Sequence, residues 1–126
     1  MEGSSVTAED DLSSLPGPLG VKYDDSLSTL VIHLVVMGMK GKTFHRASNT
    51  DIHLKYDRRR LSILMELFKL NKKAKPPRKT VFDRRYFEMK EAPGEISFCE
   101  YKIKKDQCIL IIHKTQPGLW TNALSS

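Results

Sequence analysis

Short apolar stretches alternate with polar turn segments along this chain, and their lengths are typical of strands. Leu30 to Val36 is rich in β-branched residues and too short for a typical helix, so we expect a buried strand there. Asp51 to Tyr56 alternates in polarity, which predicts a strand with Ile52, Leu54 and Tyr56 on one face. The pattern favours sheet over helix in this part of the chain.

The segment from Leu61 to Phe68 fits two periodicities. A helical stripe would contain Leu61, Leu64, Met65 and Phe68. One face of a strand would contain Leu61, Ile63, Met65 and Leu67. A stretch of about eight residues between turn-like polar segments is short for a helix, so we interpret it as a strand and keep the helix as the alternative. Tyr86 to Met89 is interpreted as another short strand.

The most apolar strand of the C-terminal third is predicted from Cys108 to Lys114, paired with Tyr101 to Ile103 in a hairpin around residues 104–107. With a period of two, one face carries Cys108, Leu110 and Ile112, and the other carries Ile109, Ile111 and His113. If the first face fills the core, exposure of the two outward isoleucines would forgo about 1.5–3 kcal/mol each. We therefore expect them to be covered by the chain's own tail or loop, by a second copy or by a partner.

These elements predict an all-β fold, an antiparallel β-sandwich of about seven strands. Residues 1–20 are rich in Ser, Gly, Pro and acids, which predicts a disordered acidic tail, and the sandwich domain is expected at residues 21–124. Two adjacent prolines, Pro76 and Pro77, are incompatible with a sheet interior, so residues 69–85 are interpreted as a basic loop. One domain and a tail account for the length of 126 residues.

The net charge of +6 is unevenly distributed along the sequence. Residues 55–85 contain twelve Lys and Arg against three acids, whereas residues 1–25 contain six acids and one lysine. The basic patch predicted within this region consists of Lys72, Lys73, Lys75, Arg78, Lys79, Arg84 and Arg85. Interleaved Phe82, Tyr86 and Phe87 could stack bases while the cations track phosphates. A solvated loop, an acidic protein surface, nucleic acid and anionic lipid stay open as explanations, as does competition from the acidic N-terminus.

No residue pattern in the chain indicates catalysis or a resident cofactor. His33, His45, His53 and His113 have neither helical metal-ligand spacing nor a Cys-x-x-Cys partner, so no metal site is predicted. The two cysteines, Cys99 and Cys108, are interpreted as small core residues in a reducing compartment. The polar N-terminus lacks a signal-like apolar segment, so we expect the cytoplasm, with the nucleus left open, and no membrane span.

The C-terminal order of residues resembles the end of the CS domain, the β-sandwich of the Sgt-type adaptors and the nuclear-distribution-C co-chaperones. The residues that carry this resemblance are Tyr101-Lys102-Ile103, Lys114, Pro117-Gly118, Trp120 and Leu124. The chain departs from the family pattern in three places. Tyr23-Asp24-Asp25 stands where the opening Trp signature is expected, the basic stretch is long, and Ile109 and Ile111 stand where Sgt-type members show charges.

The resemblance implies a seven-stranded small heat-shock-protein-like sandwich that docks proteins, often heat-shock protein 90. We therefore predict a non-catalytic co-chaperone or adaptor domain whose partner is that chaperone or an acidic client surface. The predicted partner-binding residues are Tyr101, Lys102, Ile109, Ile111 and His113. Trp120 is predicted to be structural, closing one end of the sandwich. The alternative is a nucleic-acid-binding domain that uses the basic loop 69–85, and the oligomeric state is left open.

Overall fold

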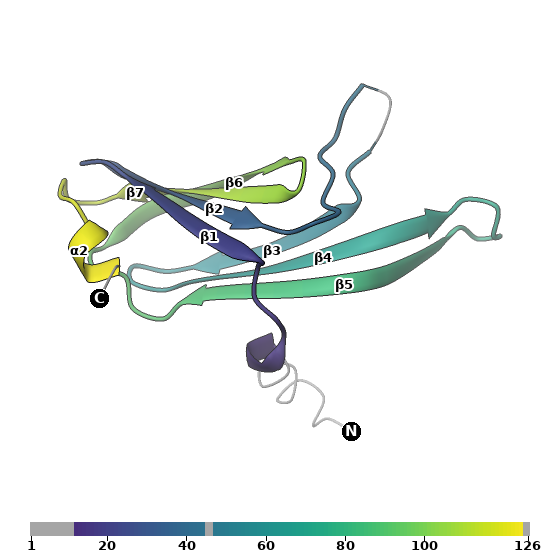
Figure 1. The fold of residues 1–126 in the computed structure, drawn as a ribbon, viewed down its shortest axis with the longest axis horizontal. Helices are drawn as coiled ribbons and strands as arrows, with labels where there is room; N and C mark the ends of the chain where they lie inside the picture. Colours follow the sequence, from purple (N-terminus) through teal and green to yellow (C-terminus); the bar gives the residue numbers. More distant parts are fainter. Residues whose placement is uncertain (1–11, 45–46, 125–126) are drawn as a thin grey trace.

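The structure is a computed structural model that describes residues 12–44 and 47–124. Its described residues form two antiparallel sheets packed face to face, as the ribbon in Figure 1 shows. One sheet has the order β1-β2-β7-β6 and the other has the order β3-β4-β5. The strands are β1 (Gly20–Asp25), β2 (Thr29–Val35), β3 (Thr50–Tyr56), β4 (Leu61–Asn71), β5 (Arg78–Met89), β6 (Ile96–Lys104) and β7 (Gln107–Lys114), followed by the short helix α2 (Thr121–Leu124). The predicted all-β sandwich of seven strands is confirmed.

Alternating side chains of three strands supply most of the core between the sheets. Each of these side chains is at most 1% exposed: Leu30, Ile32 and Leu34 in β2, Leu61, Ile63, Met65 and Leu67 in β4, and Cys108, Leu110 and Ile112 in β7. Because side chains on a strand alternate between faces, this period of two turns one side of each strand towards the opposite sheet. The strand interpretation of Leu61 to Phe68 is confirmed, and the helix alternative is wrong.

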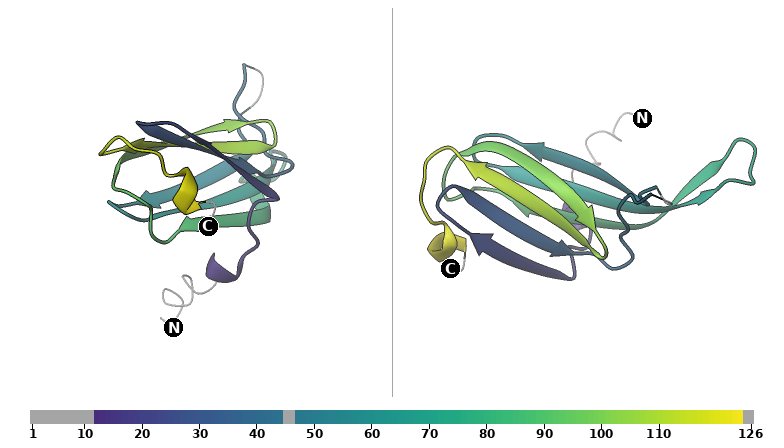
Figure 2. Two further views of the ribbon diagram at one scale, coloured as in Figure 1. Left: turned by 60° about the vertical axis from the view of Figure 1, so that its left-hand side comes forward. Right: turned by 90° about the horizontal axis from the view of Figure 1, so that it is seen from above.

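The expected basic loop 69–85 is wrong over most of its length. Residues 69–71 belong to β4 and residues 78–85 belong to β5, so only residues 72–77 connect the two strands. The paired ends of β4 and β5, with this connection, form a two-stranded arm that projects beyond the rest of the sandwich (Figure 2). We call residues 68–81 the β4–β5 arm. The two prolines lie in the connection, where they break no strand pairing.

The segment before β1 also differs from the expected tail. Residues 1–11 lie outside the described residues, but residues 12–19 run along the sandwich. The N–H of Tyr86 in β5 donates to the carbonyl of Pro16 at 2.9 Å, and the N–H of Leu19 donates to the carbonyl of Val35 at 2.8 Å. Arg85 Nη1 also donates to the carbonyl of Gly17 at 3.1 Å. Backbone hydrogen bonds to both sheets therefore fix this segment, although its composition contains few residues that could be buried.

A buried ion pair attaches the C-terminal segment to the end of the four-stranded sheet. Lys114 Nζ donates to Asp25 Oδ1, to the carbonyl of Ser26 and to the carbonyl of Gly118, each at 2.6 Å. Asp25 Oδ2 accepts from the Trp120 N–H at 2.6 Å. The Trp120 ring lies 5.0 Å from Lys114 Nζ and is 6% exposed, within the core. This group of residues is called the Lys114 clasp below.

None of the helices in the described parts of the chain has the length and apolar character needed to cross a bilayer.

Candidate protein-docking face and basic arm

The candidate docking surface is the outer face of the four-stranded sheet, the side turned away from β3, β4 and β5. Strand register places its side chains in cross-strand rows. One row runs Lys22, His33, Ile109, Lys102 across β1, β2, β7 and β6, and the next runs Asp24, Val31, Ile111, Glu100. Residues that lie directly opposite each other in antiparallel strands point to the same face. Each row therefore has apolar or imidazole side chains in the middle and charged side chains at its ends.

Four of the five predicted partner-binding residues lie on this face, and Tyr101 does not. Tyr101 is paired with Leu110, which is fully buried between the sheets, whereas Lys102 is paired with Ile109 on the outside. Adjacent residues of a strand point to opposite faces, so Tyr101 and Lys102 cannot share a surface. Tyr101 remains 42% exposed because β6 is an edge strand. The assignment of Tyr101 to the docking face is therefore wrong.

The outward isoleucines are shielded differently from what the sequence led us to expect. Ile109 is only 8% exposed and Ile111 is half-buried, yet no described helix or strand lies over this face (Figures 1 and 2). Because β7 is a central strand, both residues have neighbours from β2 and β6 on either side. The stems of long side chains such as Lys102 cover apolar surface while the charged group stays in water. Coverage by a tail or loop of the described chain was thus the wrong expectation.

Polar contacts fix several side chains on this face. His113 Nε2 and Glu100 Oε2 lie 2.9 Å apart, and the ring of Phe98 lies 5.6 Å from the ring of His113. Nearer the β6–β7 turn, His33 Nδ1 and Gln107 Oε1 lie 3.4 Å apart. These contacts hold the imidazoles in the surface, where they can exchange hydrogen bonds with a partner.

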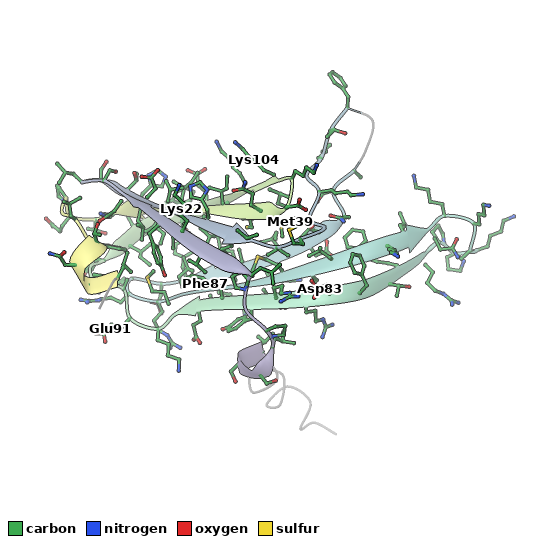
Figure 3. The ribbon with its side chains drawn as sticks, viewed as in Figure 1. Lys22, Met39, Asp83, Phe87, Glu91 and Lys104 are labelled. Carbon is green, nitrogen blue, oxygen red and sulfur yellow. The ribbon has the colours of Figure 1, made fainter. Side chains whose placement is uncertain are left out.

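Charges of both signs border the apolar middle of the face. Lys22, Lys102 and Lys104 are exposed cations, whereas Asp24 and Glu100 carry negative charge one row away. In Figure 3, Lys104 on β6 and Lys22 on β1 lie on the outer side of the four-stranded sheet. An apolar centre with a mixed charged border is the usual composition of a protein–protein contact, with charge setting orientation and encounter rate.

The β4–β5 arm holds the second concentration of charge. The sequence from Leu67 to Phe82 contains six Lys and Arg and no acid. Lys72, Lys73, Lys75 and Arg78 are exposed on the arm.

The other three residues of the predicted basic patch lie in β5, and each has an acidic partner. Lys79 pairs with Asp51, Arg84 Nε lies 2.8 Å from Glu66 Oε2, and Arg85 Nε lies 3.2 Å from Asp83 Oδ2. The structure therefore divides the patch into four exposed cations and three cations that are already partly neutralised by an acidic partner.

Two aromatic rings at the arm, those of Phe68 and Phe82, are already covered by lysine side chains. Lys79 Nζ lies 4.2 Å from the centre of the Phe68 ring, and Lys69 Nζ lies 5.6 Å from the centre of the Phe82 ring. A ring covered by an ammonium group offers one face less for base stacking. Phe87, which the sequence placed with the basic patch, instead packs against the core (Figure 3).

The cysteines and histidines do not converge. Cys99 is paired with Ile112 and Cys108 with Ile103, so the two cysteines are not opposite each other in the hairpin, and both are free thiols. His113 points to the outer face and Cys108 to the core. Burial raises the pKa of each thiol to about 12. Across residues 12–44 and 47–124, no three His, Cys, Asp or Glu side chains form a group suited to a metal ion. His45 lies outside the described residues.

Several residues of the candidate docking face could not be predicted from the sequence. Lys22, Asp24, Val31, His33 and Glu100 join it only because β1, β2, β7 and β6 are neighbours. The sequence predicted only a buried strand from Leu30 to Val36, and it carried no information on which strands lie beside it.

No family model, no curated protein and no solved structure matches this chain.

Proposed function

We propose that this chain is a non-catalytic protein-interaction module and that the outer face of the four-stranded sheet is its docking surface. The observation that carries this proposal is the row of Ile109 and His33 between Lys22 and Lys102, on a sheet face over which the described chain places no further layer. A rigid sheet can present such a row without reorganisation, which lowers the entropic cost of binding.

The size of the face sets the expected strength of binding. Four strands about 4.8 Å apart and about seven residues long give a face on the order of 20 Å on each side. That is about half of the roughly 800 Å² per partner that a standard interface buries. We therefore expect a transient complex of about micromolar affinity, unless the partner also contacts the edges of the sheet.

A place in the heat-shock protein 90 system is the specific form of this proposal, and its support is the CS-domain resemblance. Two residues of that resemblance, Lys114 and Trp120, belong to the clasp that closes one end of the sandwich. At Ile109 and Ile111 the chain departs from the family pattern, so the partner contact at these two positions would be apolar.

Nucleic-acid binding is the second candidate, favoured by the six cations and absence of acids between Leu67 and Phe82. It predicts binding that weakens steeply with salt and that is lost in the triple variant with Lys72, Lys73 and Lys75 replaced by Glu. The partial covering of Phe68 and Phe82 by lysines reduces their use as stacking platforms. For this reason we rank the protein-interaction function first.

The test is a titration of purified heat-shock protein 90 with the full chain. We expect saturable binding that Lys22→Glu/Lys102→Glu weakens by about tenfold or more, because reversing both ends of the central row reverses its charge complementarity. The matched control, Lys72→Glu/Lys75→Glu, makes the same change in net charge on the arm and should bind as the unaltered chain does. Absence of binding at about 100 µM would remove this chaperone as the partner, since even weak transient complexes form near that concentration. Equal losses of affinity in the two double variants would rule out the outer sheet face as the docking surface.

A further inference from the structure

We infer that the open edge of β5 is a second binding site, one that takes an extended acidic peptide from another protein as an added strand. This site lies on the other sheet from the proposed docking face, so neither proposal depends on the other. An added strand would extend the sheet order β3-β4-β5 by one.

The part of β5 that precedes Tyr86 has an edge with no strand partner in the described chain. β5 is the last strand of its sheet, and the N–H of Tyr86 points away from β4, because it donates to the carbonyl of Pro16. Backbone groups on alternate residues of a strand point to the same edge, so the N–H of Arg84 also points outward. Within the described chain no strand pairs with this edge. Unpaired edges of this kind are templates for an incoming strand.

A shallow groove lies beside the same residues. It has a volume of about 400 Å³ and is lined by Leu15, Pro16, Val81, Phe82, Asp83 and Arg84. Phe82 is 50% exposed and Val81 is 37% exposed, so an apolar side chain of a bound peptide would find apolar contacts there. Alternate side chains of an added strand give such a site its specificity, while the main chain supplies hydrogen bonds.

The charge around the groove selects an acidic peptide. Of the four cations along β5, three are paired with acids: Lys79 with Asp51, Arg84 with Glu66 and Arg85 with Asp83. The net positive charge near the groove therefore comes from Arg78 and from Lys72, Lys73 and Lys75 of the arm. Carboxylates on a bound strand would therefore be attracted at the end of the groove nearest the arm.

A second copy of the chain is a poor occupant. In a symmetric antiparallel pairing of two β5 edges centred on Val81, Arg78 of each copy would face Arg84 of the other. Like charges that lie directly across a strand pair are destabilising.

The chain's own N-terminal residues are also less suited to the groove. Leu12 and Ser13 line a different cavity, of about 650 Å³, together with Tyr86, Glu88 and Lys90. Leu15 and Pro16 line the groove itself, but they leave Val81 37% and Phe82 50% exposed.

Hydrogen exchange on the full chain tests this inference, with a ten-residue peptide of alternating glutamate and valine as the probe. At saturation we expect exchange of the Arg84 amide to slow by about tenfold or more, because it gains a strand hydrogen bond. The Arg85 amide faces β4 and serves as the internal control, so its exchange should not change. Phe82→Ala should weaken peptide binding by about fivefold or more through lost apolar contact, whereas Phe98→Ala should leave it unchanged. These two phenylalanines are 50% and 49% exposed, which makes them a matched pair.

Each of the following results would overturn the inference. The peptide fails to bind, or it binds without slowing exchange at Arg84, or both phenylalanine variants bind equally well. Protection of Arg84 that grows with protein concentration alone would assign the edge to a second copy. Protection that is present without peptide and is lost in Glu9→Gln/Asp10→Asn/Asp11→Asn would assign it to the chain's own N-terminus. Tighter binding of a DNA duplex that displaces the peptide would assign it to nucleic acid.

Discussion

Replacing Lys114 with Met should destabilise the protein more than any change to an exposed lysine. Lys114 has no exposed side-chain surface, and its ammonium group makes three hydrogen bonds of 2.6 Å, one of them to Asp25, whose side chain is 6% exposed. Met keeps the length and removes the charge, so Asp25 would remain as a buried carboxylate without its cation. Breaking one side of a buried pair costs about 3–5 kcal/mol. Because domains are stable by about 5–15 kcal/mol, the variant should still fold.

The pH dependence of this loss gives a second, independent check. Burial alone would raise the pKa of Asp25, but hydrogen bonds from Lys114, Thr121 and the Trp120 N–H, together with the Lys114 charge, hold it below its ordinary value of 3.8. A carboxyl with a lowered folded pKa adds stability above its unfolded pKa, and this stability is lost as the pH falls through the folded pKa. The difference between the unaltered chain and Lys114→Met should therefore be largest at neutral pH. It should shrink as the pH is lowered below 3.8.

Urea unfolding followed by the fluorescence of Trp120, the single tryptophan, measures this difference. Lys102→Met, which alters an exposed lysine of β6, is the control and should change the free energy of unfolding by no more than about 0.5 kcal/mol. In Lys114→Met/Asp25→Asn no buried charge is left unpaired, so the double variant should be more stable than the sum of the single changes predicts. A loss for Lys114→Met that equals the Lys102→Met value, or a loss that does not vary with pH, would refute the reasoning.

Two further predictions concern close packing and the thiols. A Cβ at Gly41 would lie 2.6 Å from the carbonyl oxygen of Ile103, so Gly41→Ala should lower the free energy of unfolding by about 1–3 kcal/mol, measured by thermal unfolding. The control is Gly20→Ala, whose Cβ would have its nearest neighbour at 3.5 Å and which should cost less. Equal losses in the two variants would contradict the packing described. The pKa of Cys99 and of Cys108 is about 12, so both thiols should react with iodoacetamide at neutral pH orders of magnitude more slowly in the folded protein than in urea. Mass spectrometry measures the labelling rates, and equal rates in the two conditions would show that the thiols are not buried.

The strands that face the core could be predicted from the sequence because burial imposes a visible period of two. Leu61, Ile63, Met65 and Leu67 show this period, and each is at most 1% exposed. In the β4–β5 arm, residues 78–81 show no such period, because the arm projects from the sandwich and has no core to face. With the charged segment and two prolines between its strands, the arm resembles a loop in sequence. The ordered path of residues 12–19 could not be predicted for a related reason, because backbone hydrogen bonds hold this segment and do not depend on side-chain type.

The composition of the candidate docking face could be predicted only in part. The alternation in β7 placed Ile109 and Ile111 correctly on the outside, but the same rule should have separated Tyr101 from Lys102, its neighbour in the strand. Which side chains flank Ile109 depends on the order β1-β2-β7-β6, and two of those strands are more than seventy residues from β7 in the sequence. Pairing over such distances leaves no local pattern.

Mapping the heat-shock protein 90 contact by nuclear magnetic resonance tests the proposed docking face most directly. Amide shifts of the full chain would be followed as the unlabelled chaperone is added. The proposal predicts that the perturbed amides cluster in the central row, at Lys22, His33, Lys102 and Ile109, and that β3 and β4 stay unperturbed. Perturbation confined to β3, β4 and the β4–β5 arm would contradict it.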